Sequence, residues 1–218
     1  MHILEPKPSG EERSVRQDPK QQRSIRTRVQ ILDAAAVAFA RNGYAHVTLL
    51  DIADQAGVTK GAVYFHYANK EAIAVAVSEE YFARLAALSA GVKRLKLPPV
   101  EATVKLLNRV AVTLRDDTLF QAAVRLHLDR HLIRSGLPTR PFVDFTAHCQ
   151  ESLTEAKRLG QLPEGVAPDR LARVLVAAFF GAQHISWALN DRADLIDRVQ
   201  ETVDAILPPH WYSSTDST

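Results

Sequence analysis

The sequence has one cysteine, Cys149, in 218 residues. A single cysteine excludes an intramolecular disulfide and a multi-cysteine zinc site, and it is compatible with a reducing cytoplasm. No run of apolar residues approaches the roughly 20 that a membrane-spanning helix needs. The first twenty residues lack an apolar segment after a basic one, so they do not have the pattern of a secretory signal. We therefore expect a soluble, cytoplasmic protein that does not enter a membrane.

Proline is absent between residues 20 and 97, so no helix in that stretch is interrupted by a missing amide hydrogen. Apolar residues recur at helical spacing, and no segment of useful length alternates as a half-buried strand does. The sequence predicts an all-α fold of about nine helices. The expected helices span 48–56, 59–66, 70–95, 99–115, 118–134, 140–159, 168–190 and 192–207, after a first helix that carries Ile25, Val29, Leu32, Ala36 and Phe39 on one face and ends at Asn42-Gly43.

The sequence also lacks the motifs of common enzyme classes. It contains no G-x-S-x-G, no H-E-x-x-H, no phosphate-binding loop and no glycine-rich dinucleotide turn. Asp116 and Asp117 are adjacent, so their side chains diverge on a helix and do not form a catalytic carboxylate pair. We expect no enzymatic activity, no cofactor and no metal.

Positive charge is concentrated near the N-terminus. Residues 20–70 contain seven Lys and Arg against three Asp and Glu, whereas residues 71–218 contain 17 against 18. A basic segment on a near-neutral body is a weak indication of nucleic-acid binding.

Within this basic segment, residues 48–70 predict two short helices and the start of a third. Thr48 and Thr59 are candidate N-caps, Gly57 forms the turn, and Ala53 allows the first two helices to cross closely. This pattern is typical of a DNA-binding helix-turn-helix, whose second helix enters the major groove. The pattern alone leaves open an ordinary helical hairpin, or an adaptor that uses the same motif for protein contacts.

Several runs in this region, taken together, resemble the DNA-binding domain of TetR-family regulators. They are Phe39-Ala40-Arg41-Asn42-Gly43-Tyr44, Ile52-Ala53, Ala56-Gly57-Val58-Thr59, Gly61, Tyr64-Phe65-His66-Tyr67 and Asn69-Lys70-Glu71. The resemblance implies an N-terminal three-helix helix-turn-helix domain and a larger helical domain that dimerises and binds a small-molecule effector. Its domains are a flexible arm (1–20), a DNA-binding domain (21–68), a ligand-binding and dimerisation domain (69–209) and a flexible tail (210–218).

Further runs resemble the γ-butyrolactone, butenolide and furan autoregulator receptors, and most closely the receptors for methylenomycin-type furans. They are residues 21–28, 58–66, 115–117, 176–181, Gln183-His184 and 192–194. The resemblance implies a homodimeric repressor that binds a pseudo-palindromic operator, controls antibiotic-type metabolism and its own promoter, and is released by a diffusible signal. The alternatives are a drug- or antibiotic-sensing repressor of an efflux pump or pathway genes, and a pseudo-receptor for a pathway product.

Nine residues are candidates for DNA contact through base edges, phosphates or close backbone approach. They are Arg26, Arg28, Thr48, Thr59, Lys60, Gly61, Tyr64, His66 and Lys70. Phe65 and Tyr67, in contrast, are expected to lie in the core.

The resemblance also implies ligand contacts by Tyr81, Phe82, His127, Phe142, Phe145 and Gln183. Phe145 stands where the related receptors usually have tryptophan, and Phe142 where furan receptors tend to have tyrosine, so the aromatic wall remains but loses polar groups. For His127 two other roles stay open: a structural histidine with satisfied hydrogen bonds, or a metal ligand with His131 one helical turn away. We expect the signal to act by moving the helix that begins after Asn69.

The last two long helices carry the predicted dimer interface. Its residues are Leu171, Ala178, Ala182, Ile185, Val199 and Val203. Small side chains among them allow helices to pack closely in a four-helix bundle across a two-fold axis; packing within one chain is the alternative.

Overall fold

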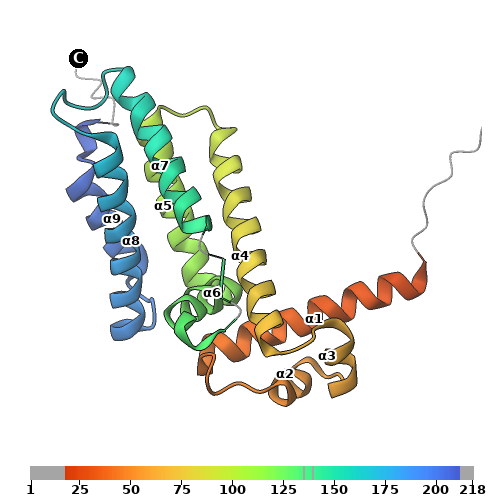
Figure 1. Ribbon diagram of the computed structural model, residues 1–218. Coiled ribbons are helices and arrows are strands. Elements are labelled where there is room, and N and C mark those ends of the chain that lie inside the picture. The colour runs from red at the N-terminus through yellow and green to blue at the C-terminus, as the bar shows by residue number, and fades with distance from the viewer. Residues whose placement is uncertain (1–17, 135, 139, 212–218) are drawn as a thin grey trace, which may run out of the picture.

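The computed structural model describes residues 18–134, 136–138 and 140–211, without the side chains of residues 140 and 141. These residues form nine α-helices and two short 3-10 helices, with no strand among them, as the sequence predicts (Figure 1). The predicted arm and tail lie mostly outside the described residues. The helices are α1 (Pro19–Asn42), α2 (Leu49–Ala56), α3 (Lys60–His66), α4 (Lys70–Lys93), α5 (Pro99–Asp116), α6 (Thr118–Leu128), η1 (Arg130–Leu132), α7 (Arg140–Arg158), α8 (Pro168–Asn190), α9 (Leu195–Ile206) and η2 (Pro209–Trp211).

The first four α-helices begin or end at the residues that the sequence predicts. Thr48 caps α2 in a capping box, because its side chain accepts a hydrogen bond from the Asp51 amide while Asp51 accepts one from the Thr48 amide. Thr59 and Asn69 cap α3 and α4 through the amides of the third residue of each helix. These caps satisfy backbone donors that would otherwise lack partners.

Two groups of helices lie at an angle to each other (Figure 1). The long α1 lies across one end of the molecule with α2 and α3 beside it. The helices α4, α5, α7, α8 and α9 run roughly along the body, and α6 lies between the body and α1. The helix-turn-helix is therefore attached to the body through α1, α4 and α6.

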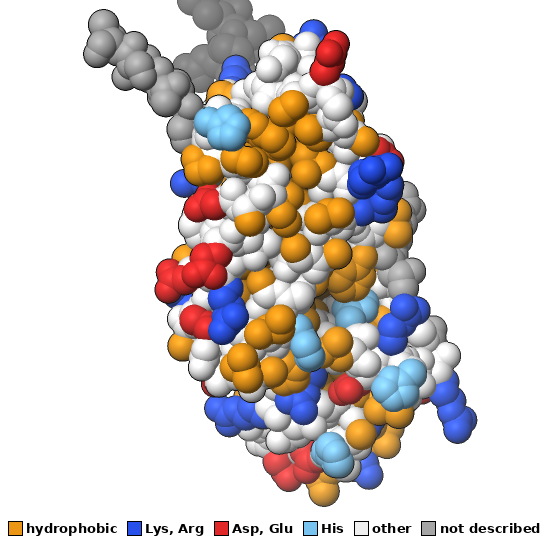
Figure 2. All heavy atoms as spheres, turned by 90° about the vertical axis from the view of Figure 1, so that its left-hand side faces the viewer, with side chains coloured by type: hydrophobic (Ala, Val, Ile, Leu, Met, Phe, Trp, Pro, Cys, Tyr) orange, Lys and Arg blue, Asp and Glu red, His pale blue; other side chains and the backbone are white. Residues whose placement is uncertain are grey.

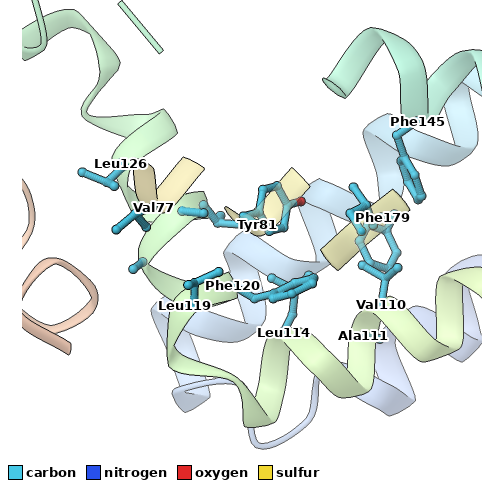
Figure 3. Packing of buried hydrophobic residues seen from close by; sticks show 14 of the residues in the cluster. Val77, Tyr81, Val110, Ala111, Leu114, Leu119, Phe120, Leu126, Phe145 and Phe179 are labelled. Carbon is cyan, nitrogen blue, oxygen red and sulfur yellow. The ribbon is translucent and has the colours of Figure 1, made fainter. Parts of the chain in front are cut away.

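The core runs without a break from α1 into the body. At its centre, the Tyr81 ring packs edge-on against Phe120 at 4.8 Å between ring centroids, and Figure 3 shows Leu114, Phe179 and Phe145 on the same side of the core. Burial of such aromatic and aliphatic side chains stabilises the fold by about 1.5–3 kcal/mol each.

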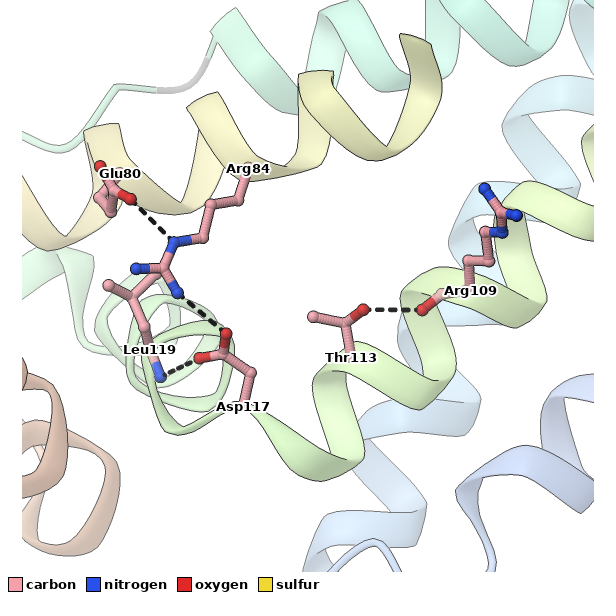
Figure 4. A network of polar contacts seen from close by, with 6 residues as sticks. All are labelled: Glu80, Arg84, Arg109, Thr113, Asp117 and Leu119. Carbon is pink, nitrogen blue, oxygen red and sulfur yellow. Dashed lines mark hydrogen bonds and ion pairs between the residues drawn. The ribbon is translucent and has the colours of Figure 1, made fainter. Parts of the chain in front are cut away.

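A charged brace connects α4 to the start of α6. Arg84 on α4 contacts Glu80 at 2.8 Å and Asp117 at 3.0 Å (Figure 4). Asp117 also accepts a hydrogen bond from the Leu119 amide, so one carboxylate caps α6 and fixes α4 against it. Since these side chains are partly exposed, the ion pairs set the helix positions more than they add to the free energy of unfolding.

Three predicted features differ from the structure. The helix expected over 118–134 ends at Leu128, and η1 follows it. The last helix begins at Leu195, because Asp191 and Arg192 take positive φ angles of 47° and 70°. The apolar face expected on α1 is exposed at Ile25 and Val29, since this half of α1 extends beyond the body.

The end of α1 is held by side chains from α6. Arg125 donates hydrogen bonds to the carbonyl oxygens of Ala40 and Arg41, and the Asp129 carboxylate accepts one from the Tyr44 amide at 2.9 Å. Between them, Gly43 takes a φ of +76°. A β-carbon there would lie 2.9 Å from the Asp129 carboxylate and 3.0 Å from Arg125. This position therefore requires glycine for both its backbone angle and its space.

We expect Gly43→Ala to destabilise the protein by more than about 1 kcal/mol, because alanine is strained at positive φ and its methyl group displaces the α6 side chains. Gly91→Ala is the matched control. Gly91 lies inside α4, and its β-carbon would make only ordinary contacts, at 3.6 Å or more. It should stabilise by roughly 0.5–1 kcal/mol. Urea unfolding measures both, and equal effects of the two substitutions would contradict this role of Gly43.

Candidate DNA-binding surface and effector pocket

The helices α2 and α3 pack as a helix-turn-helix. Ile52, Ala53 and Val63 are buried, and Gly57 makes the turn with a left-handed φ of 64°. Ala53 lies at the crossing, as the sequence predicts, because a larger side chain would separate the helices. The packing leaves one face of α3 free.

That free face carries most of the predicted base and phosphate contacts. Lys60, Gly61 and Tyr64 are exposed, and the Lys60 ammonium lies 5.8 Å from the centre of the Tyr64 ring. His66 is half-buried at the end of the helix. Thr48 and Thr59 stand at the N-termini of α2 and α3, where backbone amides favour a phosphate.

The two aromatic residues after Tyr64 behave differently from each other. Tyr67 is buried, as expected, and its hydroxyl accepts a hydrogen bond from Arg28 at 3.5 Å. The core position predicted for Phe65 is wrong: its side chain is 79% exposed. A seven-residue helix that buries Val63 turns Phe65 away from the core, and Phe65 borders an open groove with Lys20, Arg23 and Ile25 of α1.

Among the remaining cations, Arg26 is exposed on α1 and free to approach a phosphate. Lys70 instead has internal partners. Its ammonium donates a hydrogen bond to the Tyr44 carbonyl oxygen at 2.8 Å and lies 4.1 Å from the centre of the Tyr44 ring. Partial burial lowers the pKa of Lys70. We therefore assign Lys70 to the junction between the head and α4, and not to a phosphate contact.

The predicted ligand residues meet in one aromatic cluster in the body. The Phe142 ring lies 4.7 Å from His127 and 5.9 Å from Phe82, both edge-on. Phe180, which the sequence analysis does not select, joins the cluster at 5.3 Å from Phe142 and 6.5 Å from Phe145. Helices α4, α6, α7 and α8 all contribute, so their relative positions determine the shape of this cluster.

The cluster borders two cavities, each of about 260 Å³. One lies between α6, α7 and α8 and is lined by His127, Phe142 and Gln183. The other lies between α4 and α7 and is lined by Phe82 and Phe145. The predicted ligand set is thus divided between two neighbouring spaces with a shared aromatic wall.

Unpartnered polar atoms mark the inner side of this region. The Tyr81 hydroxyl, His127 Nε2 and Gln183 Nε2 are buried without a hydrogen-bond partner. The Ser78 hydroxyl on α4 is a fourth such atom; its position three residues before Tyr81 was the available signal. A buried polar atom without a partner costs about 1–3 kcal/mol, so these atoms indicate a site that a polar ligand group or water completes.

The structure narrows the roles of His127. Its unpartnered Nε2 contradicts a structural histidine with satisfied hydrogen bonds. Because α6 ends at Leu128, His131 lies in η1 and the one-turn spacing to His127 does not apply. The described residues hold no group of three His, Cys, Asp or Glu that suits a metal. Burial, and to a lesser degree Arg130, lowers the pKa of His127 to about 4, so the imidazole is neutral at pH 7.

An exposed apolar face covers α8. Ile185 and Leu189 are 48% and 69% exposed, Val174 is half-exposed, and Leu171, Ala178 and Ala182 are partly buried beside them. Figure 2 shows apolar side chains in a band along this side of the molecule, with charged groups on both flanks. Such a patch on an otherwise soluble surface is typical of a protein–protein interface.

Two predicted interface residues belong elsewhere. Val199 and Val203 are fully buried within the chain, together with Leu195. These residues recur every four positions on the face of α9 that packs against α5 and α8. The sequence pattern could not distinguish this intrachain face from an interface, since both are apolar stripes.

Comparison with known proteins decides the family. Residues 31–77 match the family model described as "Bacterial regulatory proteins, tetR family". A solved structure described as "Molecular basis for control of antibiotic production by a bacterial hormones" is 44% identical, with a TM-score of 0.77, and covers 84% of this chain and 96% of that one. The chain belongs to the tetR family.

Two further similarities fall within the same branch of the tetR family. The A-factor receptor protein of Streptomyces griseus is 34% identical over 189 residues, which are 87% of this chain and 65% of the relative. The structure of a γ-butyrolactone receptor described as ArpA-like is 28% identical, with a TM-score of 0.67, and covers 85% of this chain and 100% of that one. These findings confirm the resemblance to autoregulator receptors; the relatives are receptors and regulators.

Membership of the tetR family also accounts for the composition of α8. By length and hydropathy alone this helix could cross a membrane, and only a third of its apolar window is buried in one chain. A helix that faces its own core on one side and a second copy on the other has the same composition.

Proposed function

We propose that this tetR-family protein is a cytoplasmic, homodimeric repressor that binds a pseudo-palindromic operator through α3 and is released by a butanolide, butenolide or furan signal. Its target genes are those of antibiotic-type metabolism, together with its own promoter. The names of its relatives and the exposed α3 face support DNA binding and regulation. No catalytic step is part of this function.

The observation that carries the effector proposal is the group of unpartnered polar atoms beside the aromatic cluster. Tyr81, His127 and Gln183 come from three different helices, and each offers one buried polar atom without a partner. A small oxygen-rich ring fits this arrangement, because its oxygens accept hydrogen bonds while its carbon frame contacts the phenylalanines. Neutral His127 donates or accepts a hydrogen bond without adding charge to an apolar site.

Release of DNA follows from the position of His127 on α6. It stands between Arg125 and Asp129, whose side chains hold the end of α1. At the start of α4, Lys70 holds the Tyr44 carbonyl oxygen. A ligand that shifts α6 or α4 therefore moves the head through the same loop, so α6 is a second route beside the expected movement of α4. The ligand must prefer the shifted state, since equal affinity for both states changes nothing.

Operator binding tests the DNA-contacting face. We expect Lys60→Ala and Tyr64→Ala each to weaken specific binding by roughly 1–3 kcal/mol, because both side chains lie on the free face of α3. Lys105→Ala, at an exposed site on α5, is the charge-matched control and should bind as wild type does. Fluorescence anisotropy with the upstream region of the protein's own gene measures the affinities. Wild-type affinity in both α3 variants would exclude this face.

The effector site is tested by Tyr81→Phe and Gln183→Leu, which each remove one unpartnered polar atom with little change in volume. We expect release of the operator by a 2-acyl-γ-butyrolactone or an alkylfuran carboxylic acid to weaken about tenfold or more, in line with a lost hydrogen bond of about 1.4 kcal/mol. Operator affinity without ligand should stay unchanged. Thermal unfolding should show equal or higher stability than wild type; a marked loss would mean that these atoms are bonded within the protein.

The dimer is tested by Ile185→Glu. The side chain is half-exposed in one chain, so the carboxylate is tolerated in the monomer, but a dimer along α8 buries it without a partner at a cost of roughly 3–5 kcal/mol. Leu95→Glu, equally exposed between α4 and α5, is the control. Sedimentation should show monomers for Ile185→Glu and dimers for Leu95→Glu. If both variants remain dimeric, the interface lies away from Ile185.

A further inference from the structure

A third cavity, of about 340 Å³, lies at the end of the body far from the DNA-binding head. It is enclosed by the last turn of α4, the first turn of α5 and the middle of α7. Val92, Leu106 and Cys149, which line it, are buried. Lys93 and Glu151 stand exposed at its edge. The effector proposal above does not use this space.

One side chain connects this distal cavity to the effector pocket. His148 on α7 lines both the distal cavity and the cavity that Phe82 and Phe145 border. Burial lowers the pKa of His148; Lys93 acts in the same direction and Glu151 in the opposite one. A neutral imidazole is compatible with an apolar neighbour on either side.

Polarity changes along this series of cavities. Near α6 and α8 the buried polar atoms of His127 and Gln183 have no partners. In the distal cavity, the Ser152 hydroxyl donates to the Pro99 carbonyl oxygen at 2.9 Å and lies 3.0 Å from the Thr103 hydroxyl. The described residues that line the distal cavity include no buried side-chain atom without a partner. One end of the series therefore lacks polar partners, and the other does not.

We propose that the three cavities accept one single-chain amphiphile, whose polar ring binds at His127 and Gln183 and whose alkyl or acyl chain passes His148 into the distal cavity. This inference rests on the proposed function and adds the length and direction of the effector. From Phe142 to Cys149, α7 rises by about 10 Å. An extended chain of about eight carbons has this length, given carbon–carbon bonds of about 1.5 Å.

A series of 2-acyl-γ-butyrolactones with linear chains of 4, 6, 8, 10 and 12 carbons tests the inference, with operator release followed by fluorescence anisotropy. Each methylene that enters an apolar cavity should lower the half-maximal concentration about three- to fourfold. We expect this gain to continue to about eight to ten carbons and then to stop, because longer chains reach the exposed edge at Lys93. A response that is flat beyond four carbons overturns the inference and leaves the proposed function intact.

Variants locate the effect. Ala102→Phe fills the distal cavity from α5, and Leu97→Trp fills it from the connection before α5. Both should raise the half-maximal concentration of the ten-carbon lactone at least tenfold and leave that of the four-carbon lactone unchanged. Ala147→Phe, at an exposed position next to His148, is the control and should respond as wild type does.

Circular dichroism and operator affinity without ligand show which variants fold, and Leu97→Trp serves if Ala102→Phe does not. Equal responses of the folded cavity variant and Ala147→Phe overturn the inference. If no lactone of any length binds or releases the operator, the proposed function itself is wrong and the inference fails with it.

Discussion

The hold on Tyr44 is the constraint on which the rest of the structure depends. Its amide donates to Asp129 of α6, its carbonyl oxygen accepts from Lys70 of α4, and its ring packs against Phe39 of α1. One residue of a short loop thus has partners in all three helices that attach the head to the body. Because hydrogen bonds to charged groups are stronger than neutral ones and Tyr44 is buried, this junction transmits displacement instead of absorbing it.

The position of α6 explains how a pocket in the body reaches that junction. Asp117 caps the helix and receives Arg84 from α4, while its last turn carries Arg125, His127 and Asp129 close together. Arg125 also lies 5.2 Å from the centre of the Trp187 ring on α8. Pocket, head and the proposed dimer helix therefore meet at one short helix, so a ligand need not act over a long distance.

Local features of the fold were predictable, whereas features set by packing were not. The caps at Thr48, Thr59 and Asn69 depend on residues three positions apart, so the sequence contains all the information they need. Exposure of Phe65 and burial of Val199 depend on which side of an apolar helix meets the rest of the chain. The end of α6 at Leu128 was missed for a similar reason: the helix stops where Asp129 turns to bind Tyr44, 85 residues away in sequence.

The candidate pocket shows the same division. Resemblance to the autoregulator receptors selected its aromatic wall, but the unpartnered state of Tyr81, His127 and Gln183 appears only once four helices are assembled. These atoms lower the stability of the empty protein, since each gave up water without gaining a partner. A ligand that supplies those partners stabilises whichever arrangement of α4, α6 and α8 lets it reach all three atoms. The incomplete hydrogen bonding of the empty pocket thus makes the junction at Tyr44 responsive, because only ligand binding with such a preference shifts the balance between two states of the protein.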